Sequence, residues 1–137
     1  MSSSDDNTNG TDDTGQDAEA VQRADAGTGG WEDAVRLQRW ATPDHADFYA
    51  LAGEMVATLR AVDDLARLLH RQVAGYARTQ QDRGQVVYDD TRQVDPAERL
   101  QTAVIALGEL RSGAGTAADW ANTFWSAIGH IGTEEAR

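Results

Sequence analysis

Three histidines, His45, His70 and His130, are the side chains of this sequence best suited to hold a metal or carry a proton near neutral pH. If residues 43–80 and 96–131 form antiparallel helices, His45 approaches His130 at one end of the pair. Imidazole together with nearby carboxylates suits several divalent ions. The di-iron bundle signature Glu-x-x-His does not occur in the sequence, however. We therefore predict surface histidines, with no metal and no cofactor.

Two pairs of adjacent acids, Asp63-Asp64 and Asp89-Asp90, are the candidates for acid–base chemistry. Neighbours in a helix project about 100° apart, so Asp63 and Asp64 would not share a proton or a substrate. Turn propensity explains the second pair. The chain contains no cysteine, which excludes a thiolate zinc site and a cysteine nucleophile, and nothing matches a phosphate loop or a nucleophile elbow. These observations favour a protein that is not an enzyme.

The basic residues are all arginine, and four of them are regularly spaced. Steps of 7, 4 and 7 residues would place these four on one outward face of a helix, where they could contact phosphate or an acidic protein surface. An acid at position 64 interrupts the row and the chain is acidic, so nucleic acid is an unfavoured partner. A solvated helix face explains the row, and an acidic tail folded onto it is the alternative. The row consists of Arg60, Arg67, Arg71 and Arg78.

Aromatic residues are unevenly distributed along the chain. Antiparallel pairing of the two long helices would gather most of them at one end, with Phe48 and Phe124 in the core. Tryptophan is enriched at interaction hot spots, although packing between subunits is the structural explanation to weigh against it. The candidate partner surface is Trp31, Trp40, Tyr49, Trp120 and Trp125.

The elements that would position these residues are two long helices. Apolar residues from Phe48 to Tyr76 recur in alternating steps of 4 and 3, which is a heptad pattern. Thr42-Pro43-Asp44 fits an N-cap followed by a helical proline, so this helix is predicted over about 43–80. Gly84 would terminate the helical pattern. The heptad positions are Phe48, Ala52, Met55, Leu59, Val62, Ala66, Leu69, Val73 and Tyr76, broadened by Leu51, Val56, Leu65 and Leu68.

The second long helix is predicted over about 96–131, with Asp95 as N-cap and Glu98 three residues later. Two glycines at 113 and 115 favour a loop, yet two apolar rows keep their phase across them. We therefore favour one helix with a small-residue waist, and a break at 113–115 is the alternative. The rows are Leu100, Leu107, Ala114, Ala121 and Ile128, and Ala103, Leu110, Ala117, Phe124 and Ile131.

The formal charge of −11 is unevenly divided. Residues 1–30 hold seven acids and one base, a net −6, whereas residues 31–137 hold sixteen acids and eleven bases, a net −5. The first segment has too few apolar side chains to offset the entropy of ordering, so we predict a disordered acidic tail over 1–30. A helical domain over 31–137 would follow, beginning with a short helix at 31–40.

The predicted fold class is all-α, an antiparallel helical hairpin of two long helices plus the short N-terminal helix. A hairpin leaves part of each apolar face uncovered, so we expect a four-helix bundle, formed by homodimerisation or by folding back the 31–40 segment. No apolar run is long enough to span a bilayer and the N-terminus lacks a signal-peptide pattern. We therefore expect no membrane partner and a cytoplasmic protein, with leaderless secretion left open.

The stretch Asn122-Thr-Phe-Trp-Ser-Ala-Ile-Gly-His-Ile-Gly132 and the run Phe48 to Leu69 resemble small uncharacterised helical proteins of actinobacteria. That resemblance implies no activity, cofactor or partner. In size and hairpin form the chain is also similar to the WXG100 secreted helical proteins. That family places Trp-x-Gly between its helices and Tyr-x-x-x-Asp after them, whereas this chain has Asp82-Arg-Gly84 and no tyrosine after Ile131.

The function expected from these patterns is a non-enzymatic helical interaction, assembly or adaptor protein that binds protein partners and carries a disordered acidic arm. Two alternatives remain open. One is a leaderless secreted WXG100-like protein, and the other is an acidic inhibitor that mimics DNA.

Overall fold

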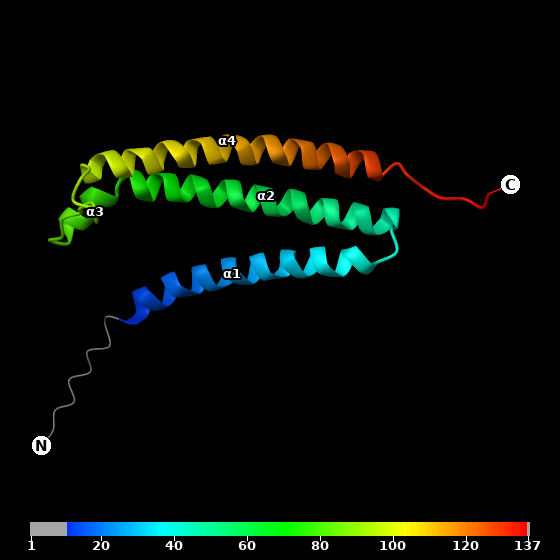
Figure 1. Ribbon diagram of the computed structural model, residues 1–137, viewed down its shortest axis with the longest axis horizontal. Coiled ribbons are helices and arrows are strands. Elements are labelled where there is room, and N and C mark those ends of the chain that lie inside the picture. The colour runs from blue at the N-terminus through cyan, green and yellow to red at the C-terminus, as the bar shows by residue number, and fades with distance from the viewer. Residues whose placement is uncertain (1–10, 137) are drawn as a thin grey trace, which may run out of the picture. The chain divides into compact units, whose positions relative to one another are not determined.

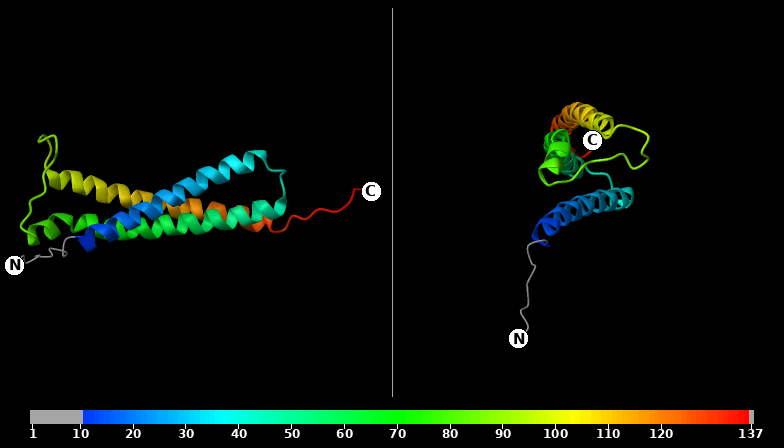
Figure 2. Two further views of the ribbon diagram at one scale, coloured as in Figure 1. Left: turned by 90° about the horizontal axis from the view of Figure 1, so that it is seen from below. Right: turned by 90° about the vertical axis from the view of Figure 1, so that its left-hand side faces the viewer.

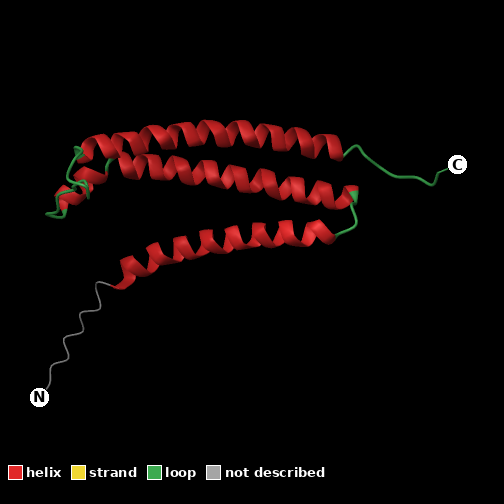
Figure 3. Ribbon diagram, viewed as in Figure 1, coloured by secondary structure: helices red, strands yellow, loops and turns green. Residues whose placement is uncertain are grey.

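The computed structural model describes residues 11–136 and divides the chain into two compact units, residues 1–42 and residues 43–137. Across the described residues every regular element is a helix (Figure 3). The all-helical prediction is therefore confirmed. Residues 1–10 of the predicted acidic tail lie outside the described residues.

The first unit contains α1, which spans Thr11–Trp40. This differs from the prediction, which confined the helix to 31–40 and placed residues 11–30 in a disordered tail. The reason is the content of helix-forming Ala, Glu, Gln and Arg between residues 18 and 24, supported by an ion pair of 3.8 Å between Glu19 and Arg23. The helix has no continuous apolar stripe, and Trp40 at its end is 84% exposed.

The second unit begins with α2, His45–Ala74. Its N-cap is Asp44, whose Oδ1 accepts a hydrogen bond of 3.1 Å from the Ala46 N–H. The prediction of Thr42 as N-cap and Pro43 as the first helical residue is therefore wrong. Proline disfavours helical backbone in the residue before it, and the extended conformation of Asp44 (φ −143°, ψ 132°) sets the helix start after the proline.

The predicted helix over 43–80 is interrupted at Gly75, where α3, Tyr76–Asp82, begins. The end of α3 agrees with the prediction at Gly84, whose φ of 74° is in the left-handed region that favours glycine. There the Gln85 N–H donates to the Gln80 carbonyl at 2.8 Å and the Gly84 N–H to the Gln81 carbonyl at 3.0 Å. These two bonds form a Schellman motif, which satisfies the last carbonyls of the helix.

The fourth helix, α4, spans Pro96–Ile128 and continues without a break through residues 113–115. The favoured single helix is confirmed, with its end at Ile128 instead of 131, and the predicted alternative break is wrong. Asp95 is the N-cap as predicted, since its Oδ1 accepts a 3.0 Å hydrogen bond from the Ala97 N–H. The residues between α3 and α4 form no regular element.

Helices α2 and α4 pack against each other and run in opposite directions (Figure 1). Tyr49 near the start of α2 contacts Trp125 near the end of α4, with ring centroids 5.7 Å apart. Asp63 meets Arg111 halfway along the pair, at 3.7 Å. The views of Figure 2 agree with the contacts in placing the two helices side by side.

The line of contact between α2 and α4, here called the contact seam, follows steps of 4 and 3 residues on both helices. Its residues are buried or half-buried, and those that are fully buried are mostly alanine. Small side chains allow the two helix backbones to approach closely. The seam is Ala52, Val56, Leu59, Asp63, Ala66, His70 and Val73 on α2, and Leu100, Val104, Leu107, Arg111, Ala114, Ala118, Ala121, Trp125 and Ile128 on α4.

Ten of the 23 apolar positions predicted for the core therefore lie in the seam, and thirteen do not. The predicted row that contains Ala52 and Ala66 is confirmed on α2, as is the row that contains Ala114 on α4. The companion rows lie outside the seam: Val62 and Leu110 are exposed, and Phe48, Ala103 and Ala117 are half-buried. Their places in the seam belong to residues one position later, among them Asp63 and Arg111. The opposite charges of these two residues lie 3.7 Å apart across the contact, although the buried Arg111 Nε has no hydrogen-bond partner among the described residues.

Replacement of Gly115 with alanine tests the continuity of α4 through its waist. A Cβ at this position meets no atom within 4 Å, so we expect Gly115→Ala to raise the free energy of unfolding by about 0.5–1 kcal/mol through helix propensity. Gly84→Ala is the matched control, and should be destabilising because of its positive φ. Chemical denaturation measures both; a destabilising Gly115→Ala would contradict a continuous helix.

The Asp63–Arg111 contact predicts non-additive mutational effects. Arg111→Leu should lower the free energy of unfolding by about 1–2 kcal/mol, because it removes a partner of a half-buried carboxylate. The double variant Asp63→Leu with Arg111→Leu should be more stable than the sum of the single effects predicts. The control cycle uses the exposed Asp64 in place of Asp63. If the single effects on the free energy of unfolding add equally well in both cycles, the Asp63–Arg111 contact contributes nothing to stability.

Candidate protein-interaction surface

A second heptad row runs along each of the two packed helices, one position before each seam residue. We call the two rows together the apolar face. On α2 the row is Leu51, Met55, Thr58, Val62, Leu65, Leu69 and Gln72. On α4 it begins before Val104 and is Ala103, Ala106, Leu110, Gly113, Ala117, Trp120, Phe124 and Ala127. The residue before Leu100 is the charged Arg99, which pairs with Asp89 and lies outside the apolar face.

The two rows lie on the same side of the helix pair. A residue one position earlier in an α-helix is rotated by about 100° around the axis. Viewed from one end of the pair, this rotation runs in opposite senses on two antiparallel helices. Because the helices also face each other, the two rotations bring both rows to one side, where they form a continuous surface about two helices wide.

Large apolar side chains on this surface remain accessible to solvent. Leu65 is 50% exposed, Leu110 is 49% exposed and Trp120 is 71% exposed. None of the residues of the apolar face carries a formal charge. A contiguous exposed apolar surface of this kind marks a site of protein or membrane contact more often than scattered single residues do.

The opposite side of the pair is mostly polar, although Ile105 on α4 lies there and is 58% exposed. It consists of residues one position after each seam residue, among them Arg60, Arg67 and Arg71 on α2, and Ser112 and Asp119 on α4. The pair therefore has one apolar side and one charged side, in addition to its contact seam.

The predicted arginine row is exposed at all four of its positions. Arg67 pairs with Asp63 at 4.0 Å, and both residues belong to α2. Arg78 lies on α3, beyond the interruption at Gly75. Arg60, Arg67 and Arg71 thus share the polar side of the pair, as the spacing indicated, and Arg78 belongs to a separate helix.

The structure brings together only part of the predicted aromatic surface. Tyr49 and Trp125 are in contact, and the Trp125 indole lies so close to Gly53 that an added Cβ would stand 3.2 Å from it. Trp125 is therefore a packing residue of the seam. Trp120 points away from this cluster to the apolar face, whereas Trp31 and Trp40 belong to α1 in the first unit.

A hollow of about 550 Å³ lies at this end of the pair, and both His45 and His130 line it. The sequence-based expectation that these two histidines approach each other is consistent with this shared hollow. The His45 Nδ1 lies 3.5 Å from Asp44. Among the described residues, no cluster of three or more His, Asp or Glu side chains is arranged to hold a metal ion.

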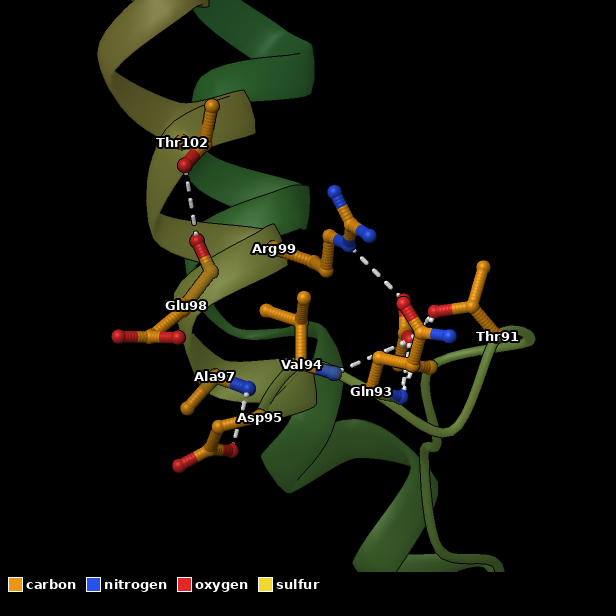
Figure 4. Close-up of polar contacts among 9 residues, drawn as sticks. Thr91, Gln93, Val94, Asp95, Ala97, Glu98, Arg99 and Thr102 are labelled. Atoms are coloured by element: carbon orange, nitrogen blue, oxygen red, sulfur yellow. Dashed lines mark hydrogen bonds and ion pairs between the residues drawn. The ribbon is translucent and has the colours of Figure 1, made fainter.

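Asp89 is central to the loop before α4. Turn propensity alone predicted an ordinary turn residue at this position. Asp89 is 7% exposed. Its carboxylate accepts hydrogen bonds from the Thr91 hydroxyl, from the N–H groups of Gln93 and Val94 at 3.2 and 3.3 Å, and from Arg99 at 2.8 Å. Figure 4 shows these donors converging from the loop and from α4. An aspartate two residues before Thr91 was the only sequence signal of this arrangement.

The hydrogen bonds fix the ionisation of Asp89. The Thr91 hydroxyl first, and then the Arg99 guanidinium, hold the pKa of the Asp89 carboxyl well below its usual range, and the two backbone N–H groups act in the same direction. The carboxylate therefore ties the loop to the first turns of α4 in its charged form. This role is structural, since each of its partners belongs to the loop or to the helix it precedes.

Comparisons of the chain with protein-family models, with curated proteins and with solved structures found no match. Within residues 11–136, none of the helices combines the length and the apolar character that crossing a bilayer demands. The apolar face is therefore the feature of the described residues that points most directly to a binding activity.

The depressed pKa of Asp89 predicts an acid-sensitive contribution to stability. A carboxyl whose folded pKa lies below its unfolded value stabilises the fold above the unfolded value, about 3.9, and loses that contribution as the pH falls further. Asp89→Asn should therefore lower the melting temperature at pH 7 and show a shallower loss of stability between pH 5 and pH 2. Asp90→Asn, at an exposed position, is the control. Parallel pH profiles for Asp89→Asn and the unmodified chain would refute this role.

Proposed function

We propose that the chain is a non-enzymatic helical interaction or assembly protein whose binding surface is the apolar face of the α2–α4 pair. The observation that carries this proposal is the group of exposed large apolar residues on one uncharged side of the pair, including Leu65, Trp120 and Phe124. In this account α2 and α4 form a helical hairpin that presents a surface for a further layer of helices.

Burial of the apolar face in a complex would contribute favourable free energy to binding. Removal of apolar area from water stabilises a complex by roughly 25 cal/mol per Å² before the costs of association. Trp120 is the most exposed large apolar residue of α4, at 71%, and tryptophan is enriched among binding hot spots. The arginines of the polar side remain solvated in this account.

Replacement of Trp120 tests the proposal. The full-length chain, Trp120→Glu and a control, Ser112→Glu on the polar side of the same helix, are each immobilised and exposed both to native cell extract and to purified full-length chain. The unmodified chain and the control should retain a stoichiometric protein partner, which can be another copy of the chain. Trp120→Glu should retain about tenfold less of the partner, because a carboxylate would replace a tryptophan that becomes buried in the complex.

Circular dichroism provides the check on folding, since both replaced residues are exposed in the single chain. Equal retention by all three chains, with equal helix content, would exclude the apolar face as the binding surface. Absence of any stoichiometric partner for the unmodified chain would contradict the proposed function itself.

A further inference from the structure

The dimensions of the apolar face match those of a stable interface between two protein chains. At 1.5 Å per residue, the part of α2 from Leu51 to Ala74 is about 35 Å long. Two helices packed 8–10 Å apart form a surface about 18 Å wide. The resulting area of about 600 Å² per copy lies at the lower end of the range for stable protein–protein interfaces.

The charge of the chain favours self-pairing through this face over any other part of the surface. With a formal charge of −11, two copies repel each other wherever acidic side chains meet. The apolar face has no ionisable residue, so pairing there brings no like charges into contact. A strongly charged partner would find no opposite charge on this face to pair with.

The two halves of the face differ at their centres in the size of their side chains. Its α2 half is bulky, with Met55, Leu65 and Leu69 exposed. Its α4 half has small residues around its centre, including Gly113 and Ala117. A twofold axis parallel to the helices would lay the α2 row of one copy over the α4 row of the other. Near the centre Val62 would then lie over Gly113 of the other copy, and nearer one end Met55 would meet Trp120.

That axis also fixes which residues meet. A rotation about an axis parallel to the helices leaves every residue at its own height along the pair. Because Asp63 contacts Arg111 within one copy, Leu65 on α2 lies at nearly the height of Leu110 on α4. In the paired arrangement Leu65 of each copy would therefore contact the neighbourhood of Leu110 in the other copy.

Helix α1 lacks the pattern needed to fill this face. Between Val21 and Trp31 it has no large apolar residue, and its remaining large apolar residues are confined to the last turns. A helix of that composition cannot match an apolar row about 35 Å long.

Resting on the proposed function, we infer that the partner of the apolar face is a second copy of this chain, paired so that α2 of each copy lies on α4 of the other. The result is a four-helix bundle with twofold symmetry and an isologous interface. Each copy then keeps its own contact seam between α2 and α4. The two apolar faces pack against each other and form the core between the copies.

Two single substitutions of opposite charge test this arrangement by native mass spectrometry of the full-length chain. Leu65→Glu and Leu110→Lys should each weaken the dimer by roughly a hundredfold, because an unpaired charge enters an apolar contact. An equimolar mixture of the two variants should recover a heterodimer, because the introduced carboxylate of one copy meets the introduced ammonium of the other. Ala57→Glu and Ser112→Lys, at exposed positions on the polar side, should dimerise like the unmodified chain.

The contrary outcomes separate the two proposals. If the unmodified chain is a monomer while Trp120→Glu still abolishes retention of another protein, the second copy is the wrong partner and the proposed function stands. If each single variant is monomeric and the mixture stays monomeric, the placement of α2 on α4 is wrong. If the variants dimerise as well as their controls, the apolar face is not the interface. Circular dichroism confirms that every variant keeps its helices.

Discussion

The close approach of α2 and α4 through small side chains is the constraint on which the second unit depends. The fully buried residues of the seam are mainly alanines, and the largest fully buried side chain among the described residues is Val56. A seam this thin removes little apolar area from water, so each contact adds little to stability. The bulkier residues of the seam, among them Leu107, Trp125 and Ile128, are half-buried, and other large apolar residues lie beside the seam, on the apolar face.

Polar contacts define how the helices of this unit are aligned. In an alanine-rich seam, many sliding positions would have similar packing energies. Asp63 and Arg111 meet at one height only, and a displaced register would separate them, which is how polar residues specify alignment in helical pairs. At one end, Asp89 ties the connecting loop to Arg99 in the first turns of α4. At the other end, the Trp125 indole fits against Gly53, where a larger residue would crowd it.

The sequence predicted the elements of this unit better than their contacts. Asp95-Pro96 specified the start of α4, and phase conservation across residues 113–115 correctly indicated one helix, because both depend on local chemistry. The choice between two neighbouring heptad rows could not be made in the same way. A hydrophobicity rule selects Val62 and Leu69, whereas the folded pair prefers positions that include Asp63 and His70, since close packing and a polar pairing across the seam outweigh side-chain hydrophobicity.

Other features were missed for physical reasons that a linear pattern does not contain. The interruption at Gly75 lies within an otherwise helical composition, and the helicity of α1 comes from propensity without an apolar stripe. The role of Asp89 depends on Arg99, ten residues away, and becomes visible only when the loop is folded. Of the candidate site, the sequence identified Trp120 as a surface aromatic, but the continuous face around it requires knowledge of which row is buried.

These observations lead to one central claim, that a pair of helices with a thin seam and a bulky, uncharged side completes its core with a second copy of itself. Sedimentation equilibrium of the unmodified full-length chain, over a hundredfold range of concentration, tests it most directly. The account predicts a mass that rises with concentration from the monomer value of 14.8 kDa to twice that value and then stays constant. A mass that remains at 14.8 kDa up to the highest concentration would contradict it.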